Sequence, residues 1–204
     1  MSLNGVEEFV GEYLKIVEGC DFVKYNTAFK AEDFPDETAK GTNKLLLMGE
    51  CDIIGIRLEK KNISGKVFMC EVSAQLGGFT PQYKEKIPKK LTKNKKYFET
   101  NLKPYFDCEC ELQFWAPFFK NTEENEKYIG KKMGNEELRK INDCQYTFIE
   151  GEEFLKRVKF FKEVLLGKKA PSYTDEKKER KENFSSPVTR FLQVVAFLEK
   201  KDKK

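Results

Sequence analysis

The stretch GECDIIGIRLEKKNISGKVFMCEVSAQ, residues 49–75, decides the fold that we predict for this chain. Residues 45–58 and 67–76 are rich in apolar and β-branched side chains, which favour β-strands. The turn KKNISG between them predicts an antiparallel hairpin. Three acids, Glu50, Asp52 and Glu71, interrupt these otherwise apolar strands. Their placement requires a physical reason, because burying a charge is costly unless it is paired.

Strand geometry offers one reason, because successive side chains point to opposite faces. Glu50 and Asp52 therefore share one face of the first strand, and Glu71, Ser73 and Gln75 share one face of the second. If the hairpin pairs as its turn suggests, the two polar rows converge. Carboxylates in such a cluster repel one another and raise a pKa, so that a cation is needed to offset the repulsion.

A divalent cation suits this cluster. Mg²⁺ prefers hard oxygen ligands, keeps several waters and takes one or two protein carboxylates together with phosphate oxygens of a substrate. Such an ion lowers the pKa of a bound water and stabilises charge on a scissile phosphate. The alternative is that the acids face water on the open side of the hairpin, beside the solvated Arg57, Glu59, Lys60 and Lys61.

The rest of the chain alternates between helical and strand-like patterns. Apolar residues recur at helical spacing over residues 6–17, 152–166 and 188–200, and residues 81–102 form a Lys-rich helix. A short helix is predicted over residues 135–141. Further strands are predicted over residues 22–29, 107–119 and 144–149. This order predicts an α/β fold, with a mixed central sheet flanked by helices.

Length and composition set the domain organisation. A chain of 204 residues with 39% hydrophobic residues can bury one core, and two full domains are not expected. We expect an α/β domain over residues 1–166, a polar linker over residues 167–187, and a C-terminal helix with a basic tail over residues 188–204. No apolar run approaches the roughly 18–20 residues of a membrane span, and the N-terminus lacks an export signal. The expectation is therefore a cytoplasmic protein with no membrane partner.

The residue types that are missing exclude several chemistries. The chain has no His, which excludes Ser-His-Asp and Cys-His catalysis. Its six Cys form no CxxC pair, so structural zinc is disfavoured. The net charge of +4 is too small to indicate a nucleic-acid partner without regard to where the charges lie. Chemistry in this chain must therefore rest on carboxylates, Lys, Tyr, thiols or metals.

The hairpin and its flanking elements resemble the PD-(D/E)XK nuclease superfamily, which includes many restriction endonucleases and archaeal Holliday-junction resolvases. The resemblance rests on GECDIIGI, a short turn, GKVFMCEVS, a Gly-containing loop and a Lys-rich helix, and it covers residues 6–119. It implies a restriction-endonuclease-like core of a helix, three strands, a helix and a strand. It also implies a magnesium- or manganese-dependent endonuclease, a hydrolase that cleaves DNA.

The resemblance assigns roles by position. Asp52 and Glu71 would be the acids that bind metal, the backbone carbonyl of Val72 a further metal ligand, and Glu50 an additional acid. Ser73 and Gln75 would orient water or substrate. An acid of the first helix, Glu8 or Glu12, would correspond to the helix acid that some members use.

One position departs from the family pattern, because the motif Lys should fall at residue 73, where this chain has Ser73. A neutral hydroxyl cannot supply the cation that positions or activates the attacking water. Some members recruit a Lys from a neighbouring element, for which the candidates here are Lys66 or a Lys of the next helix, such as Lys84 or Lys86. The alternative is a catalytically inactive nuclease-fold protein that binds nucleic acid or a protein partner.

The Lys-rich helix supplies the predicted nucleic-acid contact. Lys86, Lys89, Lys90 and Lys93 form a stripe at helical spacing, which would follow a phosphate backbone toward the metal site. Lys-rich helix faces are also often only solvated. The aromatic run Phe114, Trp115, Phe118 and Phe119 is read as core packing or a subunit contact in preference to base stacking. The expected partner is DNA, with RNA as the alternative, and a homodimer is compatible with two-strand cleavage.

Overall fold

The predicted hairpin is the centre of the sheet in the computed structural model, which describes residues 5–35, 43–59, 64–73, 81–105, 107–117, 140–141 and 144–172. Strands β2 (Leu47–Leu58) and β3 (Ser64–Val72) pair antiparallel. Ile53 lies opposite Cys70 and Leu58 opposite Gly65, which confirms the predicted antiparallel arrangement.

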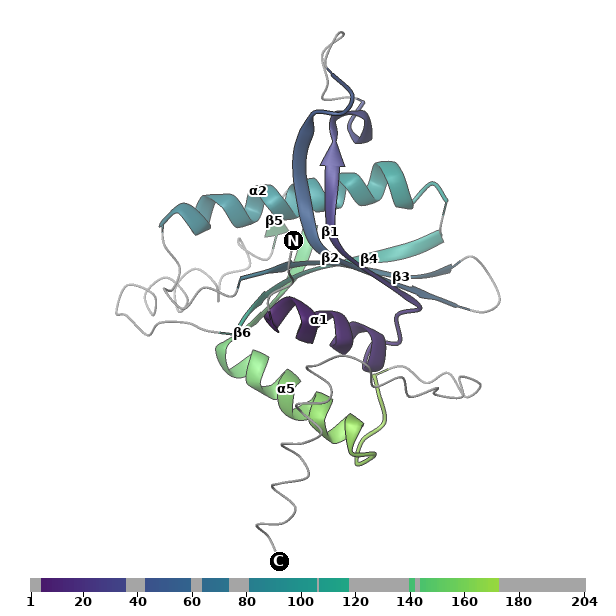
Figure 1. Cartoon of the computed structure of the whole chain (residues 1–204), viewed down its shortest axis with the longest axis vertical. Helices are drawn as coiled ribbons and strands as arrows, with labels where there is room; N and C mark the ends of the chain where they lie inside the picture. Colours follow the sequence, from purple (N-terminus) through teal and green to yellow (C-terminus); the bar gives the residue numbers. More distant parts are fainter. Residues whose placement is uncertain are drawn as a thin grey trace, which may run out of the picture.

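A six-stranded mixed sheet is built around this hairpin in the order β1-β2-β3-β4-β6-β5. β1 pairs antiparallel with β2, β4 pairs parallel with β3, and β6 pairs parallel with β4. The parallel step from β3 to β4 runs through helix α2 (Figure 1). The remaining elements are α1 (Gly5–Ile16), β1 (Phe22–Lys30), η1 (Ala31–Asp33), α2 (Pro81–Tyr97), η2 (Phe98–Leu102), β4 (Asp107–Ala116), β5 (Lys140–Ile141), β6 (Cys144–Glu150) and α5 (Gly151–Leu165).

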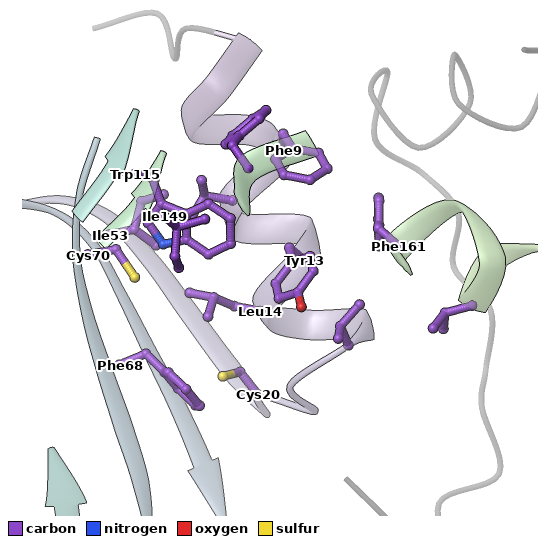
Figure 2. Packing of buried hydrophobic residues seen from close by; sticks show 14 residues of the cluster. Phe9, Tyr13, Leu14, Cys20, Ile53, Phe68, Cys70, Trp115, Ile149 and Phe161 are labelled. Atoms are coloured by element: carbon purple, nitrogen blue, oxygen red, sulfur yellow. The ribbon is translucent and has the colours of Figure 1, made fainter. Parts of the chain in front are cut away.

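Helices cover both faces of the sheet, with α2 on one face and α1 and α5 on the other (Figure 1). On the α1 and α5 face, aromatic rings fill the space between helices and strands (Figure 2). Phe9 and Tyr13 of α1 lie against Trp115 of β4, with ring centroids 6.3 and 5.3 Å apart, and Phe161 of α5 lies 5.5 Å from Phe9. Rings at these distances and angles add to the free energy gained from burying their area.

The α2 face has a core of its own. Ile87, Leu91 and Phe98 are buried, as their spacing predicts, and pack with Val67 and Met69 of β3 and with residues of β4. β3 therefore sends alternate side chains into two cores, with Phe68 and Cys70 on the opposite face. Residues of β3 that share parity with Val67 and Met69, Glu71 among them, face α2.

The structure changes the sequence interpretation in a few places. Phe114 and Trp115 are buried, which confirms the core interpretation for these two rings, while Phe118 and Phe119 lie outside the described residues. The helix predicted over residues 135–141 is wrong at its end, because Lys140 and Ile141 pair with Gln145 and Cys144. Strand pairing there overrides local helix propensity. The C-terminal helix and most of the linker, residues 173–204, also lie outside the described residues.

Fold class is thus confirmed at the level of an α/β protein with a mixed sheet flanked by helices. None of the helices in the described part of the chain is long and apolar enough to cross a membrane.

Candidate active site

Strands β2 and β3 separate at Asp52, and this separation creates the site. Pairing between the two strands ends at Ile53 and Cys70, whereas β3 stays paired with β4 as far as Val72. The N–H of Ser73 donates to the carbonyl of Trp115 at 2.8 Å, so the N–H of Val72 points toward β2. Asp52 Oδ2 accepts this N–H at 2.7 Å. A carboxylate thus takes the place of a backbone carbonyl where the ladder opens.

Glu71 lies beside Asp52 on the face that α2 covers, and only 1% of its surface is exposed. Two residues one turn apart on α2 bind its two oxygens. Lys90 Nζ donates to Glu71 Oε2 at 2.6 Å, and Asn94 Nδ2 donates to Glu71 Oε1 at 2.9 Å. Lys90 Nζ also lies 3.8 Å from Asp52 Oδ1. One ammonium group therefore serves both carboxylates.

The charges at this site are only partly balanced. Burial and the nearby Asp52 carboxylate raise the pKa of Glu71 to about 7, against the lowering by Lys90 and Asn94. Burial lowers the pKa of Lys90, but Glu71 and Asp52 raise it more, so the net shift is upward. Lys90 is therefore a cation at neutral pH, whereas the charge on Glu71 is poorly compensated. A further positive charge at this point would favour the ionised form of Glu71.

The buried thiol next to the site is not a candidate nucleophile. Cys51 Sγ donates to the carbonyls of Ile53 and Cys70, and burial raises the pKa of Cys51 well above its usual value. A thiol that stays protonated is a poor nucleophile and metal ligand. Carboxylates and the ammonium group of Lys90 are what this site offers for chemistry.

The structure brings together Asp52 and Glu71, the two acids expected to bind metal, and places the backbone of Val72 beside Asp52. Glu50 is exposed, and its charge contributes to the raised pKa of Lys90. The N–H groups of Val72 and Ser73 are used by Asp52 and Trp115. Gln75 lies outside the described residues. The roles of Glu50, Val72, Ser73 and Gln75 stay predictions.

The cation near the carboxylates is a Lys of the next helix, one of the two expected sources, although it is Lys90 and neither of the two examples named. Lys66 forms an ion pair with Glu111 at 2.5 Å and lies 5.0 Å from the Phe68 ring, on the sheet face opposite Glu71. It is therefore the wrong residue for this role. Lys84 and Lys86 belong to α2, but their side chains lie outside the described part of the structure.

The Lys residues of the predicted stripe differ in their contacts. Lys90 turns to Glu71, and Lys93 Nζ donates to the carbonyl of Met48 at the start of β2. Lys89 is exposed. Contact of these residues with nucleic acid stays a prediction, and Lys89 and Lys90 both have exposed side chains.

Glu8 and Glu12, the acids proposed on the first helix, belong to α1, which covers the sheet face opposite to α2. Glu12 is buried and forms an ion pair with Lys15 at 2.9 Å. Glu8 and Glu12 both help to raise the pKa of Tyr25 to about 12, although burial is the larger cause. Both acids therefore lie near the β1 side of α1, and a role for either at Asp52 and Glu71 stays a prediction.

A divalent cation such as Mg²⁺ needs several hard oxygen donors, of which the site provides a part. Among the residues that the structure describes, no group of three or more His, Cys, Asp or Glu is placed to hold a metal ion. Asp52 and Glu71 provide two adjacent hard-oxygen donors, which suits Mg²⁺ or Mn²⁺ because such an ion fills its remaining positions with water and substrate oxygens. The poorly compensated charge of Glu71 fits the same conclusion.

Sequence reasoning named Lys90 for nucleic-acid contact and not as the partner of Glu71, and it missed Asn94 altogether. Asn94 carried a signal, because it falls on the inward face of α2 in the series Ile87, Leu91, Asn94 and Phe98. A polar residue in an apolar stripe indicates a buried partner. Lys90 gave no comparable signal, since Lys residues surround it in the sequence.

Comparisons of the chain with protein-family models, with curated protein sequences and with solved structures found no match.

Proposed function

We propose that this chain is a metal-dependent endonuclease that hydrolyses DNA phosphodiester bonds with Mg²⁺ or Mn²⁺. The observation that carries the proposal is the convergence of Asp52, Glu71 and Lys90 at the point where β2 leaves β3. The element order supports it, because a helix, three antiparallel strands, a crossover helix and a parallel strand follow one another as in the PD-(D/E)XK nucleases. A restriction-endonuclease-like fold is part of the proposal.

Each residue has a role set by its chemistry. Asp52 and Glu71 would hold the divalent cation, which when bound supplies a water of lowered pKa and stabilises charge on the phosphate. Lys90 would take the place of the Lys that the motif lacks at residue 73. Because Lys90 stays protonated, it would attract a phosphate oxygen or orient the attacking water by its positive charge, and would not act as a base.

One observation favours a second candidate, a catalytically inactive protein of the same fold that binds nucleic acid or a protein. Lys90 Nζ already lies 2.6 Å from Glu71 and 3.8 Å from Asp52, so an internal cation occupies the place next to both carboxylates. In that case Lys90 neutralises the acids permanently. Replacing or displacing it would then be required before any metal could bind.

A cleavage assay separates the two candidates. Purified protein is incubated with supercoiled DNA, branched DNA and single-stranded RNA, each with Mg²⁺, with Mn²⁺ and with EDTA. The proposal predicts nicking or cutting of DNA that EDTA stops and that Asp52→Asn removes. Salt-sensitive binding without cleavage under any metal condition would overturn the endonuclease proposal and support the inactive candidate.

The substitution Lys90→Met tests the role given to the helix cation. It keeps an unbranched side chain of similar length and removes the charge. Cleavage should fall by about 10²–10³-fold, the size of effect seen when one stabilising donor is removed from an active site. Lys159→Met, at an exposed position of α5 on the opposite face of the sheet, is the matched control and should cleave almost as well as the unaltered protein.

A cytoplasmic location and a homodimer stay predictions.

A further inference from the structure

Asn94 is the most deeply buried polar residue of α2, with 0% of its surface exposed. Its neighbours along the inward stripe of the helix, Leu91 and Phe98, are apolar and pack against the sheet. Asn94 Nδ2 has one partner, Glu71 Oε1 at 2.9 Å. Within the described part of the chain, Asn94 Oδ1 is buried and has no hydrogen-bond partner.

A buried amide with an unpaired Oδ1 lowers the free energy of unfolding of the protein. A buried acceptor without a partner costs about 1–3 kcal/mol, and an apolar residue on this stripe would avoid that cost at Asn94 Oδ1 but leave Glu71 Oε1 without its hydrogen bond. Lys90 provides Glu71 with a cation and binds only the other oxygen. The amide of Asn94 therefore serves one group, the second oxygen of Glu71, whose direction it fixes.

Orientation of a carboxylate matters most when that carboxylate binds a metal. Partners that hydrogen-bond to a ligand oxygen fix its direction, and their loss typically weakens metal affinity by 10–100-fold. Lys90 and Asn94, spaced i and i+4 on a rigid helix, hold the two oxygens of Glu71 from one side. Asp52, whose Oδ2 is held by the Val72 N–H, faces Glu71 with a similarly fixed direction.

We propose that Asn94 is a positioning residue of the candidate metal site, which orients Glu71 toward the divalent cation and so sets the affinity for that cation. The proposal rests on the proposed function, because it assumes that Glu71 is a metal ligand. Asn94 itself need not touch the metal or the substrate.

The test measures Mn²⁺ binding to the full chain by electron paramagnetic resonance, which does not depend on cleavage. Two variants lose the amide donor while changing side-chain volume in opposite directions. Asn94→Leu keeps the branching at Cγ and adds volume, and Asn94→Ala removes volume. We expect both to bind Mn²⁺ about 10–100-fold more weakly than the unaltered protein.

A matched control lies two turns further along. Within the described part of the chain, Asn101 Nδ2 donates to the backbone carbonyls of Asp33 and Tyr97, at 3.1 and 3.3 Å. Asn101→Ala should lower stability slightly and leave the Mn²⁺ affinity unchanged. Glu71→Gln is the reference for loss of a ligand.

A second measurement separates positioning from simple destabilisation. Thermal unfolding is followed with and without saturating Mn²⁺, since a ligand that binds only the folded state raises the melting temperature. If Asn94 only stabilises the fold, both curves shift together and the increment due to Mn²⁺ is kept. If Asn94 positions Glu71, the increment shrinks in Asn94→Leu and Asn94→Ala but not in Asn101→Ala.

The outcomes are distinguishable. Weakened Mn²⁺ binding in both Asn94 variants, with binding abolished in Glu71→Gln, supports the proposal. Unchanged binding in either Asn94 variant, with loss in Glu71→Gln, overturns the role of Asn94 and leaves the proposed function standing. No Mn²⁺ binding by the unaltered protein, or full binding by Glu71→Gln, overturns the metal site and the positioning role with it.

Discussion

Each face of the sheet contains a carboxylate paired with a Lys, but the pKa of the carboxylate is lowered on one face and raised on the other. On the α1 and α5 face, Glu111 forms an ion pair with Lys66 and accepts hydrogen bonds from Gln113 Nε2 at 2.8 Å and Thr147 Oγ1 at 3.4 Å. Gln113 Oε1 in turn accepts from Trp115 Nε1 at 2.9 Å. This polar network is well satisfied and ties β3, β4 and β6 together.

The pKa values of Glu111 and Glu71 are shifted by different causes on the two faces. Burial raises the pKa of Glu111, but its hydrogen bonds with Gln113 and Lys66 lower it more, so the net shift is downward. Glu71 on the α2 face has its pKa raised to about 7, because burial and Asp52 outweigh Lys90 and Asn94. A protein built only for stability would be expected to treat both acids as it treats Glu111. The proposed function accounts for this contrast, because a bound cation would compensate the charge of Glu71.

The largest effect expected from this comparison is on cleavage by Asp52→Asn. The amide oxygen can still accept the Val72 N–H, while the negative charge for a metal is lost. We expect metal-dependent cleavage to fall about a thousand-fold, equal to roughly 4 kcal/mol of activation free energy. Single-turnover rates with Mn²⁺ measure the loss, and urea unfolding should show a stability within about 1 kcal/mol of the unaltered protein. Cleavage at the normal rate would contradict the role of Asp52.

On the other face, Phe161→Ala should act on stability alone. Phe161 is fully buried against Phe9 and Tyr13, so its truncation leaves a cavity and is expected to cost about 3–5 kcal/mol in the free energy of unfolding. Chemical denaturation measures this cost. The cleavage rate per folded molecule should be unchanged, and a large change in that rate would show that the two faces are not functionally separate.

The pH dependence of stability distinguishes the faces without any substrate. The folded chain holds the proton of Glu71 more tightly than the unfolded chain, because the pKa is raised from 4.5 to about 7. This group therefore makes the free energy of unfolding fall as pH rises from about 4.5 to 7, by up to about 3 kcal/mol. Urea unfolding across this range should show the fall in the unaltered protein and not in Glu71→Gln. Parallel pH profiles for the two proteins would contradict the unbalanced charge at Glu71.

The smallest effect is expected for Glu111→Gln. It keeps a side chain of the same shape and an acceptor oxygen, and it removes the charge that faces the partly exposed Lys66. The free energy of unfolding should fall by about 1 kcal/mol or less, and less at high salt because ions screen the pair. Cleavage should be retained. Loss of cleavage in this variant would indicate that the cleavage site lies on the α1 and α5 face, contrary to the proposal.

The sequence was sufficient for the hairpin, because period-two patterns and a polar turn specify strands locally. The burial of Ile87, Leu91 and Phe98 also followed from helical spacing alone. Asp52 and Glu71 were found for the same reason, since their parity in two paired strands brings them to one region.

The rest depended on tertiary geometry. Nothing in the local pattern indicates that β2 leaves β3 at Asp52, or that Asp52 binds the freed N–H of Val72. The rotation of α2 about its axis decides which Lys meets Glu71, and it selects Lys90 from a run of similar residues. The error at Lys66 is different, because its parity in β3, which the sequence already shows, puts it on the face opposite Glu71.

The most direct test is a crystal of the protein soaked in Mn²⁺, examined by anomalous scattering. Our account predicts a single strong peak between the carboxylates of Asp52 and Glu71, with Lys90 moved away from its contact with Glu71 Oε2. No peak at this position, with the contact between Lys90 and Glu71 intact at saturating Mn²⁺, would contradict the metal site and with it the proposed endonuclease.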